Sequence, residues 1–491
     1  MKKIILYAAC VLSLASCKKF LDVNTDPNKA VTVPSKVLLP TTTIGIGWAN
    51  TNELGRAASV LVQYNAGLAN QSLGYDSYNL AGLFDNQWDY EIYAKVVNNL
   101  RIIIKQSEAT DPAYSGIAKM QLAYIISIAT DVWGDVPYSQ AGFGLEFPQP
   151  RYDKQEDIYQ GNAALGITSL FDLVRSGIAD MDKVSALKPT TDDLIYGGAV
   201  AKWKRAGNSL LLKFANTISG VNPTLAKTVI TEVLGSANGY INDNTLDFQV
   251  PFASSTGNQN PMYVQDISGS FKNGEMLSSR FLALTKSMND TVRLAKFYTK
   301  KPIPATPTIL RFVAYDNGSG VTLPTLATRS EYNTYVVGAA GEAPARLLTN
   351  FQMQFILAES AITLGTSGDA NALYQAGIKA SMAKVGMTTA EINGYFDTNP
   401  TIVTLAGTNE EKVKQIITQK YISLVGNGIE AYNDYRRTGY PVLAPATNAA
   451  GDNGGKIPLR YVYTSGEGNA NPNQPKPTIK TSVKVWWGKA L

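Results

Sequence analysis

Apolar residues recur at helical spacing along much of the chain beyond residue 87. Between residues 88 and 105 they lie three or four positions apart, as on one face of a helix, at Ile92, Val96, Leu100 and Ile103. The stretch 117–130 is apolar on nearly every side, which is typical of a buried helix. Similar patterns predict further helices at 158–181, 203–218, 351–364, 370–385, 411–425 and 428–437.

These helices are expected to pair into hairpins, namely 88–105 with 117–130, 158–181 with 203–218, 351–364 with 370–385, and 411–425 with 428–437. Stacked helix pairs are typical of helical solenoids, although the chain has no fixed repeat length and no tetratricopeptide consensus. The stretches 238–345 and 439–477 are rich in Gly, Asn, Ser and Pro, apart from a β-like run at 309–314. We therefore predict one large, mostly α domain with long ordered loops and minor β structure.

The first residues have the pattern of a secretory leader. Lys2 and Lys3 precede an apolar run that ends at Leu12 and is shorter than the ~20 residues that span a bilayer. The following Leu-Ala-Ser-Cys, residues 14–17, resembles a bacterial lipobox, in which the cysteine thiol accepts diacylglycerol before cleavage. An ordinary signal peptide with an incidental cysteine is the alternative. The expected organisation is a lipoprotein signal peptide at 1–16, a tether lipidated on Cys17 at 17–36, and one helical domain at 37–491.

Composition narrows the chemistry that the protein could perform. The 491-residue chain contains no histidine, and its two cysteines are Cys10 and Cys17. Serine–histidine catalysis, histidine-ligated zinc and a disulfide within the body of the protein are therefore excluded. The formal net charge of +5 is too small to imply a nucleic acid partner. No phosphate-binding loop or metal-ligand cluster is apparent, so we expect neither a cofactor nor a metal.

Several charged residues have both a functional and a structural interpretation. Asp131 and Asp135 could form a glycosidase pair or bind calcium, but Asp also terminates helices around Gly134. Glu359 could be a general acid, yet a helix-surface role is favoured. Arg436 and Arg437 could bind an anion or simply meet the dipole at a helix end. A basic helix face is expected to be solvated; it comprises Lys202, Lys204, Arg205 and Lys213.

The stretch 63–79 has the composition of a sugar-binding loop, because it mixes aromatic rings, neutral amides and glycine. Rings stack on the apolar faces of sugars, while Asn and Gln bond to the hydroxyl groups. The candidate ligand-binding residues are Tyr64, Asn70, Gln71, Tyr75 and Tyr78. Tyr75 and Tyr78 would share a face only on a helical turn. Ordinary polar loop packing is the alternative interpretation, and no catalytic residue is predicted.

Six segments together resemble one protein family. They are 17–24 (CKKFLDVN), 131–138 (DVWGDVPY), 203–210 (WKRAGNSL), 356–361 (ILAESA), 428–441 (GIEAYNDYRRTGYP) and 485–487 (VWW). Their order along the chain is similar to that of the SusD/RagB family of nutrient-binding outer-membrane lipoproteins. One difference is that Lys18 and Lys19 follow Cys17, where surface-exported lipoproteins often carry acidic residues.

The resemblance implies tetratricopeptide-like helical hairpins and a lipid-anchored, cell-surface position in the outer membrane, over a TonB-dependent β-barrel transporter. It also implies that the protein captures glycans, or oligopeptides in some members, and delivers them for import. The family places its ligand-binding aromatics in loops, which implies core roles for Trp88, Trp133 and Trp203. The alternatives are a surface glycoside hydrolase with paired carboxylates and a non-catalytic adhesin.

Overall fold

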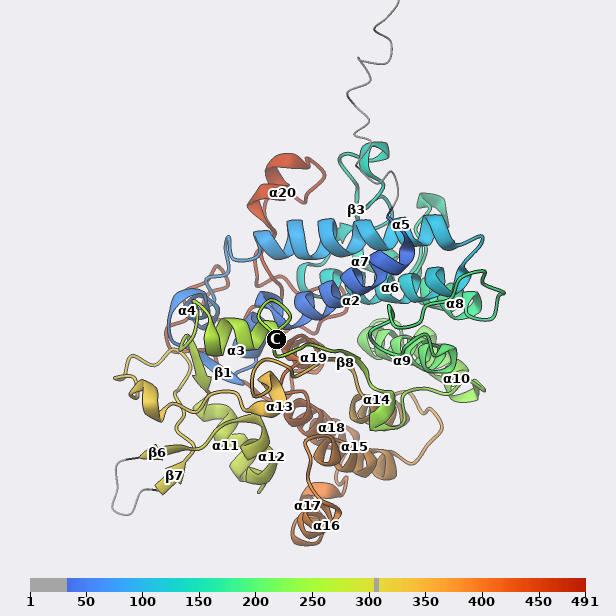
Figure 1. Cartoon of the computed structure of the whole chain (residues 1–491). Helices are drawn as coiled ribbons and strands as arrows, with labels where there is room; N and C mark the ends of the chain where they lie inside the picture. Colours follow the sequence, from blue (N-terminus) through green and yellow to red (C-terminus); the bar gives the residue numbers. More distant parts are fainter. Residues whose placement is uncertain (1–32, 304–308) are drawn as a thin grey trace, which may run out of the picture.

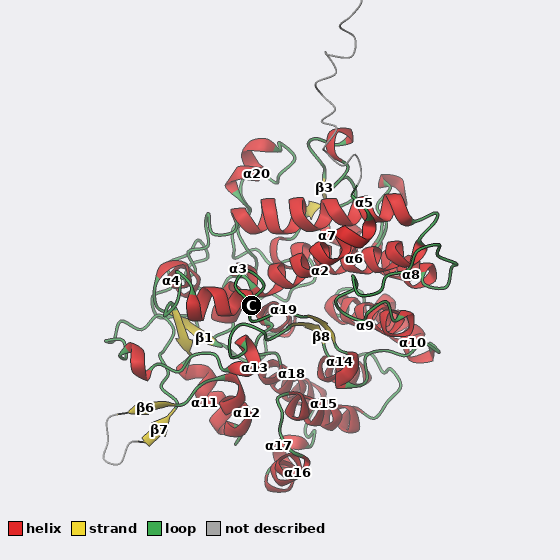
Figure 2. Ribbon diagram, in the orientation of Figure 1, coloured by secondary structure: helices red, strands yellow, loops and turns green. Residues whose placement is uncertain are grey.

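The computed structural model of the chain describes residues 33–303 and 309–491. It confirms a mostly helical architecture with little strand (Figure 2). The predicted signal peptide at 1–16 and most of the tether at 17–36, including Cys17, lie outside the described residues. Helix α2 (Ser35–Thr51) already begins within the last residues of the expected tether. No helix in the described ranges is both long and apolar enough for a bilayer span.

The first predicted hairpin is confirmed. The chain forms the π-helix η1 (Gln87–Val97), continues directly into α5 (Asn98–Ser107), and returns in α6 (Pro112–Trp133) against α5. Helix α6 begins with proline, whose missing N–H costs nothing at the first helical position. Every residue of α6 is buried, because α2, α5, α8 and α9 surround it (Figure 1).

The second hairpin differs from the prediction because the expected helix at 158–181 is broken. The structure has α7 (Gln155–Gln160) and α8 (Leu170–Asp180), separated by residues 161–169, which contain the short 3₁₀ helix η3 (Ala163–Leu165). Gly161 has φ 83°, a conformation that glycine adopts at low cost and that ends α7. Ser169 restarts the helix, because its hydroxyl accepts from the Asp172 N–H at 2.9 Å. Helix α9 (Val200–Ile218) packs on α8 as predicted, and α10 (Pro223–Gly235) is an unpredicted addition.

The third hairpin is also confirmed and continues the array. Helices α14 (Asn350–Thr363) and α15 (Ala370–Lys384) pack closely, and α14 also contacts α9. At their crossing a Cβ on Gly377 would lie 2.8 Å from the Phe355 ring, so only glycine fits there. Two unpredicted short helices, α16 (Thr389–Thr398) and α17 (Pro400–Val403), then lead to α18 (Asn409–Ser423), which packs on α14 and α15.

The fourth predicted hairpin has a different main partner. Helix α19 (Gly428–Thr438) packs mainly against α3 (Glu53–Leu61), near the start of the chain, and only weakly against α18. A Cβ on Gly428 would lie 2.5 Å from the Gly55 carbonyl oxygen, so the two helix backbones touch at this point. Nearby, the Tyr461 hydroxyl donates to the Leu54 carbonyl at 2.8 Å. The C-terminal part of the chain therefore closes onto the N-terminal helices.

The described parts of the long irregular regions are ordered and contain the minor β structure that the sequence predicts. Within 238–345 lie α11 (Ser279–Ser287), α12 (Thr291–Phe297) and α13 (Thr334–Val337). The described residues form four antiparallel strand pairs: β1 (Asn65–Gly67) with β5 (Glu275–Leu277), β2 (Val136–Pro137) with β3 (Tyr152–Asp153), β4 (Phe248–Val250) with β8 (Ala345–Leu348), and β6 (Lys301–Ile303) with β7 (Ile309–Arg311). The β-like run at 309–314 thus begins with β7.

Two carboxylates that were candidates for a catalytic pair have separate structural partners. Asp131 is fully buried and accepts from the Tyr159 hydroxyl at 2.7 Å and the Asn433 amide at 2.9 Å. Asp135 instead accepts from the backbone N–H and the side-chain amide of Gln155, each at 3.1 Å. Neither carboxylate therefore caps backbone groups around Gly134 as expected. Asp135 instead holds the first residue of α7, and Asp131 belongs to the interior of the helical array.

The expectation that Lys213 belongs to a solvated face is wrong, because its ammonium group is buried between Asp131 and Glu430 at 3.3 and 3.2 Å. The helix-surface role expected for Glu359 is also wrong. Its carboxylate is buried and forms a two-pronged ion pair with Arg437. The sequence around Lys213 and Glu359 suggests that both side chains face solvent. In the structure the charge of each is instead paired with an opposite charge on another helix.

Candidate functional site

The structure places the three predicted ligand-binding tyrosines in the core. The Tyr64 ring stacks on Tyr421 with centroids 4.5 Å apart, and the Tyr75 ring lies parallel to Phe84 at 6.2 Å. The Tyr78 hydroxyl accepts from the Ala446 N–H at 2.7 Å. Tyr64 and Tyr75 have no exposed surface, and Tyr78 has 3%. A ligand could stack on these rings only if the segment opened.

The other two predicted residues begin helix α4 (Asn70–Asp76), on the side of the segment that meets solvent. Asn70 is exposed and Gln71 is half-buried. Asp76, at the end of α4, holds the segment down by accepting from the Asn317 amide at 2.6 Å and from the Gly318 N–H at 2.5 Å. Burial outweighs these bonds and raises the pKa of Asp76 to about 6. The ligand-binding role of all five residues stays a prediction.

Behind this segment lies a buried polar cluster that joins α3, α4 and η1. The Glu91 carboxylate accepts from the Asn52 amide at 2.7 Å through one oxygen, while its second oxygen has no partner among the described residues. Burial, which the Asn52 bond only partly offsets, raises the pKa of Glu91 to about 7. Gln87, the first residue of η1, is fully buried, and both of its amide atoms lack a partner in the described structure.

A surface groove of about 320 Å³ begins at Trp88, the second residue of η1. We call it the aromatic groove. It lies between η1, the start of α5, the loop that joins β2 to β3, and the short helix α20 (Ser465–Ala470), at the upper end of the molecule in Figure 1. Its lining residues are Trp88, Asp89, Tyr93, Ala94, Asn98, Pro137, Ala141, Gly142, Gly144, Phe147, Pro148, Pro150 and Glu467.

The floor of the aromatic groove is a stack of rings. Trp88 packs against Tyr93 at 5.1 Å and lies nearly parallel to Tyr152 at 6.0 Å. From behind, Trp88 meets Trp133 edge-on at 4.9 Å, and Trp133 contacts Phe84, the ring that stacks on Tyr75. The expected core role of Trp88 and Trp133 is confirmed by their burial. Tyr75, predicted as a ligand platform, instead supports this floor from beneath.

The wall of the groove is the loop at 138–150, and Arg101 of α5 fixes its first part. The Arg101 guanidinium donates to the Tyr138 carbonyl at 2.8 Å and stacks over the Phe143 ring at 5.0 Å. Phe147, half-buried, meets Phe143 edge-on with centroids 6.2 Å apart. The groove therefore offers a solvent-accessible ring on a loop that is held in place by a cation.

The rim carries neutral and acidic hydrogen-bonding groups. Asn98 is exposed, and Glu467 accepts from the Tyr152 hydroxyl at 3.2 Å and from the Asn471 amide at 2.9 Å. Asp89 lies beside them with much of its side chain in solvent, and partial desolvation of its carboxyl group, with a smaller effect of Asp85, raises its pKa. Rings below and amide and carboxylate oxygens above are the arrangement that recognises sugars. No acid cluster able to hold a metal occurs in the described ranges.

Sequence reasoning missed the aromatic groove because Trp88 reads as a core residue and the loop at 142–150 joins no predicted element. A signal was nevertheless present, since Phe143 lies between Gly142 and Gly144 and Phe147 directly precedes Pro148. This pairing of rings with Gly and Pro is the same kind of evidence that selected the stretch 63–79.

Comparison with known proteins fits this architecture. Residues 27–464 match the family model of SusD-like proteins, described as starch-binding and associating with the outer membrane. A solved chitin-binding protein is 25% identical, with a TM-score of 0.77, and the alignment covers 93% of this chain and 100% of that one. A chitin-binding SusD homologue from Flavobacterium johnsoniae is 24% identical over 92% and 98% of the two chains, with a TM-score of 0.76.

A SusD/RagB family protein from Bacteroides thetaiotaomicron has the same fold at 22% identity, with a TM-score of 0.75 over 93% of this chain and 100% of that one. No curated protein matches the chain in sequence. The family match extends over most of the chain. It includes four of the six segments that resemble the family, namely 131–138, 203–210, 356–361 and 428–441. The chain therefore belongs to the SusD-like family of starch-binding proteins that associate with the outer membrane.

Proposed function

We propose that the protein captures glycans in the aromatic groove at the cell surface and delivers them to a TonB-dependent β-barrel transporter. The observation that carries the proposal is the pair of half-buried rings, Tyr93 and Phe147, in the groove beneath the polar rim of Asn98 and Glu467. Stacking on a ring is worth about 0.5–1.5 kcal/mol, so two such contacts give the modest affinity that a capture protein needs. Solved relatives described as chitin-binding support a glycan rather than a peptide ligand.

The cell-surface position in this proposal depends on the lipobox at 14–17, with Cys17 as the lipidated residue. Two or three acyl chains hold a protein on a membrane almost permanently, since each buried CH₂ contributes roughly 0.8 kcal/mol. A protein anchored in this way needs a separate channel for its ligand, and a family that associates with the outer membrane supports a barrel partner there.

A second candidate function follows from the two carboxylates on the rim. Asp89 and Glu467 line the same groove, and two acids flanking a sugar are the catalytic equipment of a glycoside hydrolase. Glu467 is occupied by two hydrogen bonds, as expected for a residue that positions groups rather than transfers protons. Relatives described as binding proteins also favour capture without hydrolysis.

The test is a binding screen with protein that begins after Cys17, against α-glucans, chitin oligosaccharides and unrelated glycans. Phe147→Ala should weaken the best ligand about tenfold, since loss of one stacking contact costs about 1 kcal/mol. Phe396→Ala is the matched control, because Phe396 is a half-buried ring on α16 outside the groove. Equal affinity of wild type and Phe147→Ala would contradict binding in the groove.

The same screen separates the two candidate functions. Chromatography of the incubated ligand should show no product. Product that disappears in Asp89→Asn or Glu467→Gln would identify a hydrolase instead.

A further inference from the structure

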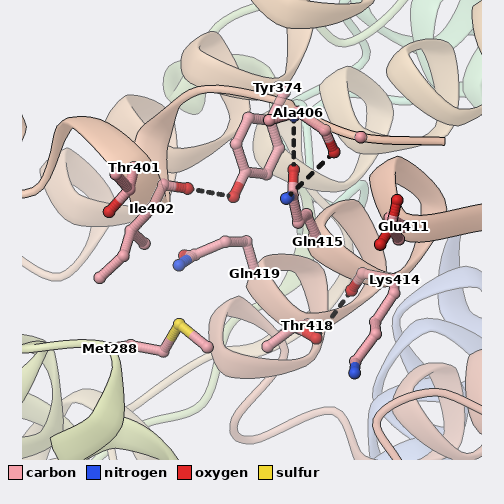
Figure 3. A pocket seen from close by; sticks show the side chains of 11 residues that line it. Met288, Tyr374, Thr401, Ile402, Ala406, Glu411, Lys414, Gln415, Thr418 and Gln419 are labelled. Carbon is pink, nitrogen blue, oxygen red and sulfur yellow. Dashed lines mark hydrogen bonds between the residues drawn. The ribbon is translucent and has the colours of Figure 1, made fainter. Parts of the chain in front are cut away.

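The aromatic groove carries negative charge that no base in its wall balances. Asp89 and Glu467 line it, whereas none of the described residues that line it is a lysine or an arginine. A larger pocket of about 490 Å³ beside α18 differs in this respect, because Glu411 and Lys414 both line it (Figure 3). The charge of the groove is therefore one-sided, and that of the larger pocket is balanced.

The acidic groups of the groove converge on the start of α20. Asp89 belongs to η1, but a Cβ on Gly466 would lie 3.4 Å from its Oδ2, so its carboxylate lies against the residue that precedes Glu467. The Ser465 hydroxyl donates to Oδ2 of Asp85 at 3.2 Å, although 380 positions separate the two residues. Three carboxylates from two distant parts of the chain thus meet at one place on the rim.

The two carboxylates that line the groove keep free acceptor capacity. Desolvation and Asp85 are the influences on the Asp89 carboxyl group, and no hydrogen bond from a described residue is among them. Glu467 accepts from Tyr152 and from Asn471 through the same oxygen, Oε1. Its Oε2 receives no hydrogen bond within the described part of the chain. A ligand that brings donors would therefore find acceptors at both residues.

The bases that neighbour the groove-lining residues in sequence are engaged elsewhere. The Lys95 ammonium lies over a ring of α2, 5.8 Å from its centroid. Arg101 donates to two carbonyl groups of the loop behind the groove wall, at 2.8 and 3.3 Å. Arg151 pairs with Asp153 at 2.7 Å. None of these three cations is placed to neutralise the rim.

The aromatic floor of the groove shows the effect of this charge. Desolvation raises the pKa of Tyr93 and of Tyr152, and the negative charge of Glu467 raises both further. Neither a lysine nor an arginine of the described structure is a main influence on either ring. The rings and the carboxylates together form a negatively charged, aromatic surface, and such a surface attracts cations.

We propose that the aromatic groove prefers amino sugars, that is, glycans with a free, protonated amino group. The inference rests on the proposed function and narrows the class of glycan that it captures. The sugar ring stacks on Tyr93 and Phe147, and the ammonium group donates to Asp89 and Glu467. An ammonium group has only donors, so it suits a rim of free acceptors, and the faces of the rings attract it as well. Acidic sugars are repelled by the same carboxylates.

The test is calorimetric titration of the full chain with trisaccharides of glucosamine, N-acetylglucosamine and glucose that share one linkage. An α-amino group has a pKa of about 7.7–8.0, and a sugar amine of this kind is charged at about pH 6. The glucosamine trisaccharide should bind at least about fivefold more tightly than the other two, through exposed ion pairs and cation–π contact. This preference should shrink at about 1 M salt, where screening acts within about 3 Å.

Two conservative variants locate the preference in the groove. Asp89→Asn and Glu467→Gln keep the size of each side chain and remove its charge, so the ratio of glucosamine to glucose affinities should fall toward one. Asp397→Asn is the matched control, since Asp397 is exposed on α16 outside the groove, and it should keep the wild-type ratio. Phe147→Ala should weaken the charged and neutral trisaccharides alike.

The outcomes separate this inference from the proposed function. Equal affinity for the three trisaccharides would overturn the amino-sugar preference and leave glycan capture intact, whereas binding of none would overturn both. Trilysine that binds as tightly as the glucosamine trisaccharide would show recognition of charge without a sugar, against the inference. A preference that survives in the Asp89→Asn/Glu467→Gln double variant, with circular dichroism showing it folded, would also contradict it.

Discussion

The ammonium group of Lys213 lies 3.3 Å from the carboxylate of Asp131, with 2% and 0% of the two side chains exposed. Burial alone would lower the pKa of Lys213, but Glu430 and Asp131 together raise it above the usual value. The lysine therefore stays charged and links α9 to α6 and α19. Removal of one partner from such a buried pair leaves the other charge without compensation.

Lys213→Met should destabilise the protein by about 3 kcal/mol or more, because it strands two buried carboxylates. Urea unfolding monitored by circular dichroism measures the loss. Lys202→Met is the matched control on the same helix, since Lys202 is exposed and has no recorded ion pair in the described structure. A shift of the same size in both variants would mean that the ion pair is not the cause.

Glu91 should give the protein a distinct pH dependence. Its pKa rises from 4.5 unfolded to about 7 folded, so the folded state binds more protons than the unfolded state between these values. Stability therefore falls as pH rises through this window. Glu91→Gln removes the ionisation. The free energy of unfolding of this variant should exceed that of wild type by an amount that grows from near zero at pH 4.5 to about 3 kcal/mol at pH 8.

Urea midpoints of wild type and Glu91→Gln across pH 4.5 to 8 test this effect. The exposed Glu146→Gln is the control and should follow the wild-type curve at every pH. Parallel curves for wild type and Glu91→Gln would show that Glu91 titrates at the same pH in the folded and unfolded states.

Tyr75 and Tyr78 should respond in opposite ways to loss of the hydroxyl. The Tyr75 hydroxyl is buried without a partner in the described structure, so Tyr75→Phe should be neutral or stabilising. The Tyr78 hydroxyl accepts from the Ala446 N–H, so Tyr78→Phe strands a backbone donor at a cost of about 1–3 kcal/mol. Thermal unfolding of the two variants compares them directly, and equal stability would contradict the hydrogen-bond assignment.

Cys17→Ala should abolish lipidation and release the protein from membranes. The thiol is the atom to which a lipobox attaches diacylglycerol, so alanine leaves no acceptor. Labelled fatty acid and membrane fractionation measure the two effects, with Cys10→Ala as the control because Cys10 lies inside the expected signal peptide. Incorporation of label into Cys17→Ala would disprove the anchor.

The helical hairpins could be predicted because their apolar spacing is a local property. The pairs α5 with α6 and α14 with α15 follow from it directly. The break at Gly161 could not be predicted in this way, because the apolar pattern continues on both sides and only the turn itself requires a positive φ. Periodicity also does not reveal which helix covers which, so the contact of α19 with α3 was missed.

The candidate site shows the same limit. The stretch 63–79 has the residues of a sugar-binding loop, but burial of Tyr75 depends on Phe84 and on the rings behind it. Lys213 looks solvent-facing within its helix, and its partner Asp131 lies 82 positions earlier. Composition identifies groups that could bind a ligand. Only the distant partners decide whether those groups face solvent or the interior.

The closure of α19 onto α3 has a consequence for the order of folding. Leu54 and Tyr461 are hydrogen-bonded although 407 positions separate them, and Gly428 touches Gly55 through the backbone. Contacts of such long sequence separation form late and slow the folding reaction. The side of α3 that packs on α19 is therefore covered only after the segment at 428–438 has joined the fold, whereas α2 already packs on η1, α5 and α6, which lie within the first 133 residues.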